Sequence, residues 1–405
     1  MRSSLVSKLA STALVVVSLI LSIWLAEVGL RIFFHGTVFS PVGDSAAQER
    51  HPVRGAAHRP NTTIGMLKLS FAATAKINSR GTRGPEFDLV PKPGITRILV
   101  VSDSNVFGSG VNDGETLTDQ MQAILGRDKY EIINLSVAAY SNVQQYLWLV
   151  DEGLSYKPNM VIFGFTPSND IQTNYYPLQA VFQRDSKRPY AVSDGKGGFT
   201  IDNSYMLAYA DEAKKVKPLH VVRDFLAGPL VKRVVGQAIE ATTGGRKTDP
   251  NIWIGWPFLF EYSLTDAEGG RTAAYYDKLW SDGWEVTKAV IRGMRDKSEA
   301  AGAKFVMYPF VSKMQGNPDF LAQVQAALPN LKLDLEKPER EMRKFSNEGG
   351  IPMISMYDAV IRAARAGDRN IYFEPDDEHM TAHGYQISAE ALLADLRAQG
   401  LLTNP

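Results

Sequence analysis

The stretch RILVVSDSNVFG, residues 97–108, decides the expected fold of this chain. Residues 97–101 form a short apolar run of the kind that makes a strand buried inside a sheet. Three polar residues, Ser102, Asp103 and Ser104, follow the run directly. The stretch therefore predicts a buried strand whose carboxyl end opens into a polar loop.

Apolar runs of similar length recur on the carboxyl side of this stretch. They lie at residues 131–134, 160–165, 304–308 and 352–355. Apolar residues at helical spacing separate them, and helices are expected within residues 116–126, 143–154, 276–301, 320–328, 337–346 and 388–398. Strands that alternate with helices predict an α/β fold of three layers, flavodoxin-like, with a parallel sheet covered on both faces. The carboxyl ends of such strands meet at one edge, where these folds bind ligands.

The bulk composition excludes several classes of function. The chain has 405 residues, of which 44 are Lys or Arg and 44 are Asp or Glu, so its formal net charge is zero. A chain without a net positive field has no electrostatic support for a role in binding nucleic acid. The absence of cysteine excludes disulfides, thiolate metal sites, iron–sulfur clusters and a cysteine nucleophile.

The amino terminus predicts a membrane anchor. Arg2 and Lys8 precede an apolar run over residues 9–26, which at about 1.5 Å per residue nearly spans a bilayer core of about 30 Å. Charged and bulky residues follow the run and make a poor cleavage site, so we expect an uncleaved transmembrane signal anchor over residues 1–35 rather than a removed signal peptide. The positive charges ahead of the run predict that the rest of the chain lies on the extracytoplasmic side.

The remainder of the chain divides into two parts by composition. Residues 36–94 are rich in Gly, Pro, Thr and Arg without sustained periodicity, and we interpret them as a stalk or a wrapping arm. Residues 95–405 form the expected α/β domain, which an insertion rich in aromatic residues and glycine interrupts from about 171 to 275. We expect the insertion to be a cap with an amphipathic helix over about residues 220–239.

The loops after the predicted strands carry residues suited to acyl-ester chemistry. Ser104 follows the first strand and His379 follows the last strand and a helix, so the histidine can take the proton that makes the serine hydroxyl nucleophilic. Asp376, three residues before His379, can orient the imidazole and stabilise its charged form. The oxyanion formed during attack needs donors, which the amides of Ser104 and Ala139 and the side chain of Asn169 can supply.

These loops resemble the four sequence blocks of the SGNH/GDSL hydrolases. The matching blocks are Asp103-Ser104, the segment around Ala139, Asn169-Asp170, and the Asp-x-x-His motif at 376–379. The segment INSRGTRG at residues 77–84, ahead of the first strand, is similar to the lead-in of membrane-anchored bacterial members. The resemblance implies an SGNH hydrolase fold and a Ser104–His379–Asp376 mechanism that requires no cofactor.

The chain departs from the family pattern at three glycine positions. Ser102, Ala139 and Pro167 stand where the family has glycine. None of the three changes removes a reactive group, and the amide of Ala139 remains usable provided that its φ angle is negative. The changes leave open an altered or degenerate site.

Several of these residues have other interpretations. Ser104 can cap a helix, and His379 can be a surface histidine. His383 competes with His379 as the base, although a helix start is expected to turn it elsewhere. The cluster of acidic residues and histidines at 376–383 can hold a divalent metal, but it lacks the spacing of a metalloprotease motif, so no metal is expected.

The expected function is that of a membrane-anchored serine hydrolase acting on O-acyl esters. A small-molecule or glycan ester of the cell envelope or the extracellular space is the expected substrate. Aromatic residues of the insertion pack a core or lid, or stack on sugar rings; they are Trp253, Trp256, Phe258, Phe260 and Tyr262. Two alternatives remain open: an O-acyltransferase that uses the same serine site on a polysaccharide, and a non-catalytic glycan-binding protein with a decayed site.

Overall fold

A computed structural model describes most of the chain beyond residue 47. The described residues are 37–40, 48–68, 70–182, 187–206, 260–261, 273–327, 332–375 and 377–402, together with isolated positions between 11 and 25.

A parallel sheet of four strands forms the centre of the α/β domain. The strands are β6 (Thr96–Ser102), β7 (Tyr130–Ser136), β8 (Met160–Phe165) and β12 (Lys304–Pro309), in the spatial order β12-β8-β6-β7. All three pairings are parallel. The polar loops after these strands therefore lie at one edge of the sheet, which confirms the predicted parallel α/β arrangement.

The prediction of a strand at residues 352–355 is wrong, because this segment forms no strand in the structure. Only Met353 forms a bridge, parallel to Met307 of β12. The Met307 amide donates to Pro352 at 3.0 Å and the Ile354 amide to Met307 at 3.0 Å. The amide of Ser355 turns instead to a carboxylate of the last helix, and proline at 352 has no amide to donate, so the ladder stops after one residue.

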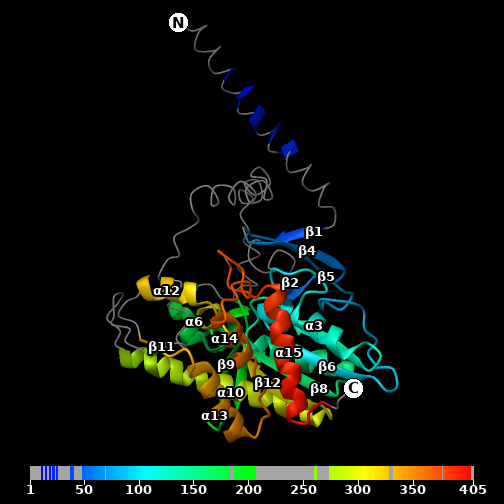
Figure 1. The fold of residues 1–405 in the computed structure, drawn as a ribbon, viewed down its shortest axis with the longest axis vertical. Coiled ribbons are helices and arrows are strands. Elements are labelled where there is room, and N and C mark those ends of the chain that lie inside the picture. The colour runs from blue at the N-terminus through cyan, green and yellow to red at the C-terminus, as the bar shows by residue number, and fades with distance from the viewer. Residues whose placement is uncertain are drawn as a thin grey trace.

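Alternate side chains of the strands build two separate hydrophobic cores. Leu99 and Val101 of β6 face one core, which α4 (Asn142–Asp151), α10 (Ala273–Ala300) and α13 (Lys337–Gly349) cover. Ile98 and Val100 face the other core, which is covered by α3 (Leu117–Leu125), α14 (Tyr357–Arg365) and α15 (Ala382–Ala398). Helices thus enclose the sheet from both sides (Figure 1), which is why the central residues of its strands are mostly apolar on both faces.

Side-chain caps begin the helices next to the sheet. Thr116 and Asp119 form the predicted capping box at the start of α3, and Gly126 ends that helix. Ser141 and Gln144 form a second capping box at the start of α4. Each box satisfies backbone amides that the first helical turn leaves without partners.

The remaining elements are short and lie in the connections. The helices are α2 (Ser104–Phe107), a 3₁₀ helix (Gly153–Tyr156), α5 (Asp170–Asn174), α6 (Tyr176–Phe182), α11 (Lys313–Gly316) and α12 (Pro318–Ala327). Two small antiparallel sheets pair β9 (Tyr190–Ser193) with β10 (Phe199–Asp202), and β11 (Phe260–Glu261) with β13 (Lys332–Leu333). The helix expected at 220–239 and the aromatic side chains at 253–262 lie outside the described residues.

Residues 48–94 contain two antiparallel hairpins that the sequence pattern did not indicate. β2 (Gln48–His51) pairs with β3 (Gly55–His58), and β4 (Thr62–Leu67) pairs with β5 (Ala72–Ile77). A further strand, β1 (Thr37–Ser40), lies parallel to β4. Every second residue of β5 is buried, but two of these residues are alanines, so the alternation is weak as a hydropathy signal.

The second hairpin packs onto the loops at the sheet edge. Its buried side chains contact Phe107 at the end of α2 and Ala138 after β7; they are Ile64, Met66, Ala73, Ala75 and Ile77. We refer to residues 48–94 as the arm. The described arm therefore covers part of the domain at the edge where the polar loops meet.

Arg83 of the arm connects it to the loop that carries Ser104. Its side chain is buried, and its guanidinium donates to the carbonyls of Phe107 at 2.8 Å, Gly108 at 2.7 Å and Val111 at 2.7 Å. It also pairs with Asp113 at 3.1 Å. One side chain thus holds the whole turn after α2.

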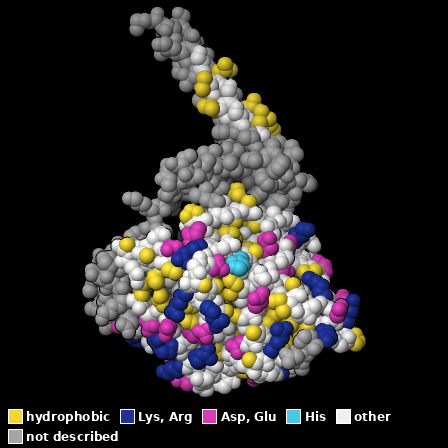
Figure 2. Space-filling view, viewed as in Figure 1, with side chains coloured by type: hydrophobic (Ala, Val, Ile, Leu, Met, Phe, Trp, Pro, Cys, Tyr) yellow, Lys and Arg dark blue, Asp and Glu magenta, His cyan; other side chains and the backbone are white. Residues whose placement is uncertain are grey.

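The predicted anchor, residues 1–35, lies largely outside the described residues. Within the part of the chain that is described, no helix is both long enough and apolar enough to cross a bilayer. On the face seen in Figure 2, basic and acidic side chains are interspersed over the described surface.

The Arg83 contacts predict a large loss of stability when the guanidinium is removed. Arg83→Met should lower the free energy of unfolding by about 3 kcal/mol, because it leaves buried carbonyls without a donor and Asp113 without its partner. Urea denaturation measures the change. Arg80→Met, at an exposed position of the same segment, should cost about 0.5 kcal/mol or less; equal losses in the two variants would contradict the assignment.

Candidate active site

A pocket of about 150 Å³ lies at the carboxyl edge of the sheet. Four loops form its walls: those after β6, β8 and β12, and the loop ahead of α15. Its lining residues are Ser104, Asn105, Thr166, Pro167, Ser168, Asn169, Phe310, Val311, Ser312, Lys313, Glu378 and His379. The structure thus brings Ser104, Asn169 and His379 into one pocket, as the sequence predicted, whereas Ala139 is not part of its lining.

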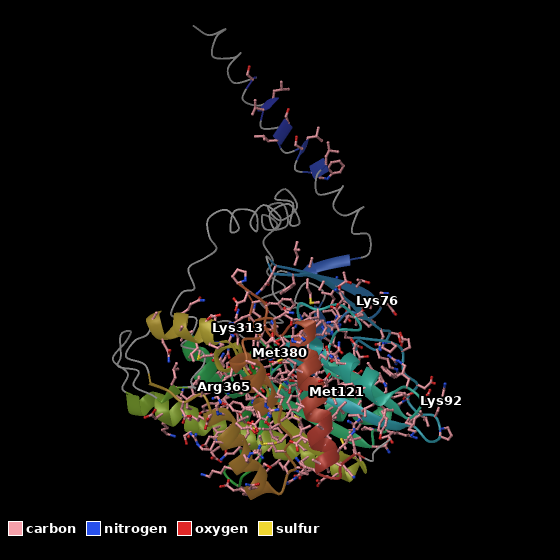
Figure 3. The ribbon with its side chains drawn as sticks, in the orientation of Figure 1. Lys76, Lys92, Met121, Lys313, Arg365 and Met380 are labelled. Carbon is pink, nitrogen blue, oxygen red and sulfur yellow. The ribbon has the colours of Figure 1, made fainter. Side chains whose placement is uncertain are left out.

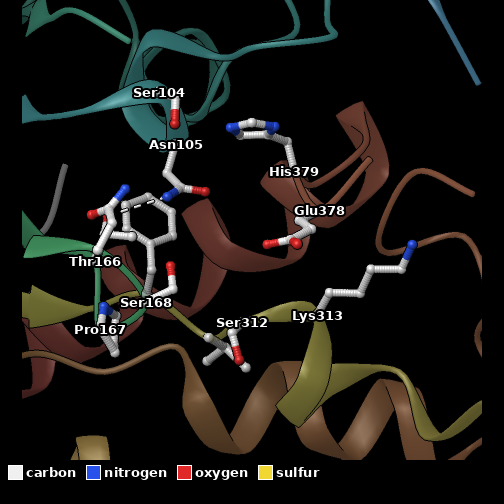
Figure 4. A pocket seen from close by; sticks show the side chains of 12 residues that line it. Ser104, Asn105, Thr166, Pro167, Ser168, Ser312, Lys313, Glu378 and His379 are labelled. Atoms are coloured by element: carbon white, nitrogen blue, oxygen red, sulfur yellow. Dashed lines mark hydrogen bonds between the residues drawn. The ribbon is translucent and has the colours of Figure 1, made fainter. Parts of the chain in front are cut away.

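Ser104 is the first residue of α2, and only Asp103, which caps this helix, separates it from the buried end of β6. Figure 4 shows the side chains of Ser104 and His379 as neighbours in the lining of the pocket. The serine needs a base that can take its proton, and this arrangement presents one.

The imidazole of His379 is paired with a carboxylate. Its Nδ1 lies 2.7 Å from Oδ1 of Asp377, and the same oxygen accepts the backbone amide of His379 at 2.7 Å. The Asp377 side chain is only 3% exposed, so this contact is shielded from water. With Nδ1 engaged, Nε2 is the nitrogen that remains for Ser104.

The carboxylate at Nδ1 belongs to Asp377, one residue after the Asp376 that the spacing favoured. Asp376 lies outside the described residues. The Asp-x-x-His spacing selected Asp376, whereas the structure pairs the imidazole with Asp377, which is only two residues before His379.

The electrostatic environment favours the charged form of His379. Burial alone would lower its pKa, but the charge and hydrogen bond of Asp377 outweigh burial, and Asp103 adds to them, so the pKa of His379 is raised above its usual 6.5. The charge of His379, together with that of Lys68, holds the pKa of Asp377 below its ordinary range despite the burial of this carboxyl. The pair therefore has the polarity that a base and its orienting carboxylate need.

His383 occupies a different position. It lies in α15, with its Nε2 2.7 Å from Oδ2 of Asp368, and its side chain is 42% exposed. It is not part of the pocket lining. The expected direction of this side chain, away from the site at the start of a helix, agrees with the structure.

A buried carboxylate that sequence reasoning passed over organises two walls of the pocket. Asp103 accepts hydrogen bonds from the amide and the side chain of Asn105, from the Thr166 hydroxyl at 3.0 Å and from Asn169 Nδ2 at 3.0 Å. Asp170, also buried, accepts the Thr166 amide at 2.6 Å. Burial, and then the nearby charge of Asp103, raise the pKa of Asp170 well above its ordinary value.

Asn169 presents its amide group to the pocket from the loop after β8. One hydrogen of its side-chain nitrogen goes to Asp103, which fixes the amide plane. An amide nitrogen has two hydrogens, so the second remains to act as a donor toward a bound ligand.

Two of the three glycine replacements have clear structural roles. Ser102, fully buried, donates its hydroxyl to the carbonyl of Gly164 at 2.8 Å and so links β6 to β8. Pro167 occupies the second position of a turn in which the amides of Asn169 and Asp170 return to the Thr166 carbonyl at 3.3 and 3.1 Å. Proline suits this position because its φ is preset and no amide is needed there.

Ala139 contradicts the condition set for it. Its φ is +64°, in the left-handed region, whereas the expectation of an unstrained donor amide required a negative φ. This conformation costs a residue with a Cβ atom about 1–2 kcal/mol relative to glycine. Its carbonyl accepts a hydrogen bond from Arg188 at 2.9 Å, which helps to hold the strained backbone.

The loop after β12 supplies pocket residues that the sequence analysis overlooked. Phe310–Lys313 follow a predicted strand, so the rule applied to the other strand ends would have found them. Lys313, labelled in Figure 3, is 1% exposed and donates to the carbonyls of Phe373 at 2.7 Å and Asp377 at 2.9 Å. It clamps the loop that carries His379.

Glu378 lies between Lys313 and the Asp377–His379 pair. Its carboxyl group is part of the pocket wall (Figure 4), and burial raises its pKa to about 7. The pocket therefore contains an acid that titrates close to neutrality beside His379.

One group of described residues brings three possible metal-binding atoms together: His51, Asp151 and Glu152, within 4.8 Å of one another. The Arg54 guanidinium lies 2.7 Å from Glu152 and 3.4 Å from His51 Nδ1. A fixed positive charge at this distance opposes a divalent cation, so this group lacks the character of a metal site.

Comparison with known proteins gives only distant likenesses. No protein-family model matches the chain, and no curated protein matches it. Among solved structures, TesA is similar at a TM-score of 0.34 and 11% identity, over 75% of this chain and 99% of TesA. A member of the lipolytic G-D-S-L family from Veillonella parvula is similar at 0.32 and 10%, over 74% and 97% of the two chains. A catalytic mutant of the acetylxylan esterase Axe2 from Geobacillus stearothermophilus reaches 0.37 and 10%, over 76% and 96%.

The strain at Ala139 predicts a stabilising substitution. Ala139→Gly should raise the free energy of unfolding by about 0.5–1 kcal/mol, since relief of the left-handed strain exceeds the added entropy of the unfolded chain. Urea denaturation measures it. Ala138→Gly, at the adjacent buried alanine without a positive φ, should destabilise the protein instead; destabilisation in both variants would disprove the strain.

Proposed function

We propose that this protein is a serine-dependent hydrolase of O-acyl esters. The observation that carries the proposal is the pocket that Ser104 and His379 line together, in which Nδ1 of His379 is 2.7 Å from Asp377. A hydroxyl, a base and an orienting carboxylate in this order are the groups required to form and hydrolyse an acyl-enzyme.

In the proposed reaction, Ser104 Oγ attacks the ester carbonyl while His379 Nε2 takes its proton. The buried Asp377 stabilises the imidazolium that forms. His379 then gives the proton to the departing alkoxide, so the alcohol leaves and the acyl group remains on Ser104. A water molecule, deprotonated by His379, attacks the acyl-enzyme; the serine regains its proton and the carboxylic acid is released.

The developing oxyanion requires donors on the side of the pocket away from His379. The Ser104 amide and the second hydrogen of Asn169 Nδ2 are suited to this role, because the bond from Asn169 to Asp103 preorganises the amide. Ala139 contributes a third amide only if its strained loop approaches Ser104 more closely when an ester is bound.

The pocket favours a short acyl group. Its volume of about 150 Å³ is small beside the 300–1,000 Å³ or so of typical ligand pockets, and its walls include the hydroxyls of Ser168 and Ser312 and the carboxyl of Glu378. We therefore propose an acetyl-sized ester of a hydroxylated alcohol, with a carbohydrate as the class of alcohol that matches these polar walls.

We propose further that the enzyme is membrane-anchored with its pocket outside the cytoplasm. The described apolar side chains between positions 11 and 25 are exposed to about half of their surface or more: Leu14, Val15, Leu19, Leu21, Trp24 and Leu25. A run of exposed leucine, valine and tryptophan is stable against a bilayer rather than in water.

A fluorophosphonate probe tests the nucleophile, because it reacts with a serine that a base has activated. The wild-type chain should be labelled on Ser104, and Ser104→Ala should not be labelled while its thermal stability changes little. Ser168→Ala is the matched control, since this serine lines the same pocket. Label that persists without Ser104 would identify another nucleophile.

A comparison of adjacent aspartates tests the orienting carboxylate. Asp377→Asn should lower kcat by roughly 10³–10⁴-fold, because the imidazole loses its tautomer and its counter-charge. Asp376→Asn should cost far less; the reverse order would restore Asp376 to the role expected from spacing.

The same assay has a defined pH dependence. His379 acts as a base only when it is neutral. Because its pKa is raised above 6.5, kcat/KM should already decrease before the pH has been lowered to 6.5. In Asp377→Asn the residual activity should fall at lower pH than in the wild type, since the raising interaction has been removed.

A further inference from the structure

An ion pair joins the arm to the carboxylate of the active site. Lys68, which follows β4, places its Nζ 2.7 Å from Oδ2 of Asp377. The other oxygen of the same carboxylate holds His379 at 2.7 Å. The Asp377 side chain is 3% exposed and that of Lys68 is 21% exposed, so the charges meet largely out of solvent. Both carboxylate oxygens are thus engaged, one by imidazole and one by ammonium.

The turn that carries Lys68 is held against the same loop by a second contact. The Lys68 amide donates to the carbonyl of Phe71 at 2.9 Å and closes the turn between β4 and β5. The ring of Phe71 packs on Phe373, with ring centroids 4.8 Å apart. Gly110 leaves room for this contact, since a Cβ atom there would lie 2.6 Å from Phe373 and 3.0 Å from Phe71. The position of Lys68 is therefore set by packing as well as by charge.

We propose that Lys68 is a positioning residue of the active site, which holds Asp377 in the orientation that pairs with His379. The β4–β5 turn, which carries Lys68, then contributes to the activity of the site. This inference rests on the proposed function of Ser104, His379 and Asp377. A carboxylate held at one oxygen can rotate about its side-chain bonds, whereas one held at both has a single orientation. Groups that orient metal ligands by such hydrogen bonds contribute roughly 10–100-fold to activity, and we expect an effect of this size here.

Lys68 also acts on the charge of His379. The charged groups that face the imidazole come from several elements: Asp377 and Glu378 from its own loop, Lys68 from the arm and Asp103 from the loop after β6, with Lys313 of α11 beside Glu378. Burial lowers the pKa of His379, Asp377 and Asp103 raise it, and Lys68 lowers it. Removal of the ammonium should therefore move the acid limb of activity to higher pH.

The experiment uses the full chain and three variants of Lys68. Lys68→Met removes the charge and the hydrogen bond, Lys68→Gln removes only the charge, and Lys68→Arg retains both. Lys76→Met is the matched control, because Lys76 is an exposed lysine of the same hairpin (Figure 3). The readouts are the rate of fluorophosphonate labelling from pH 5 to 9 and the titration midpoint of the His379 imidazole by NMR, which separates it from Glu378.

We expect Lys68→Met to label at least about tenfold more slowly than the wild type at pH 8, and to titrate His379 at higher pH. Lys68→Gln should share the shifted midpoint with a smaller loss of rate, and Lys68→Arg should restore both properties. Lys76→Met should behave as the wild type does.

Two results would overturn the proposal: wild-type rate and midpoint in Lys68→Met, or equal loss in the methionine and arginine variants with an unchanged midpoint. Lys68→Gln decides the matter if thermal melting shows that Lys68→Met is unfolded. A wild-type chain that is never labelled would refute the proposed function, while the His379 midpoint would still report whether Lys68 acts on the imidazole.

Discussion

The carboxylate of Asp103 is the constraint on which the geometry of the site depends. It is fully buried at the end of β6 and accepts hydrogen bonds from residues of two loops, Asn105 after β6 and Thr166 and Asn169 after β8. A buried charge is stable only when hydrogen-bond donors surround it. Asp103 therefore holds both loops in the positions from which their donors reach its carboxylate. Ser104 follows Asp103 directly in the chain, so the hydrogen bonds of Asp103 also fix the backbone of Ser104. Burial and the charge of Asp103 raise the pKa of Asp170, so a second negative charge beside Asp103 is disfavoured.

The site is completed from both ends of the chain. The arm supplies Arg83, which holds the turn after Ser104, and Lys68, which pairs with Asp377. The carboxyl-terminal loop supplies Asp377, Glu378 and His379, clamped by Lys313. The sheet itself positions only Asp103 and Ser104, at the end of β6. Ion pairs and hydrogen bonds of Arg83, Lys68 and Lys313 position the other groups of the site.

The sequence predicted those features that depend on strong local patterns. The apolar runs of β6, β7, β8 and β12 and the capping box of Thr116 were visible because burial on both faces and helix capping leave residue-by-residue signatures. The serine and histidine of the pocket were found because a strand-end rule and a family resemblance agreed.

Features that depend on tertiary contacts left no such signature. The arm hairpins were missed because the inward residues of β5 are mainly small alanines, and the strand at 352–355 failed because Ser355 bonds to the last helix. The spacing selected Asp376 although Asp377 pairs with the imidazole, and the positive φ of Ala139 belongs to a loop whose carbonyl bonds to the distant Arg188. Lys68 and Arg83 are ordinary basic residues in the sequence, and only their burial against distant carbonyls and carboxylates shows their roles.

The contact between Lys68 and Asp377 also joins two distant parts of the sequence, so it can form only after both have been made. The two residues are about 300 positions apart, and the docking surface of the arm includes Phe107, Ala138 and Phe373. During synthesis the arm can pack on Phe107 and Ala138 early, but its contacts with Phe373 and Asp377 cannot form until nearly the whole domain has been made. Contacts of such long sequence separation form slowly. A chain that lacks its last thirty or so residues would therefore have no loop for Lys68 to join.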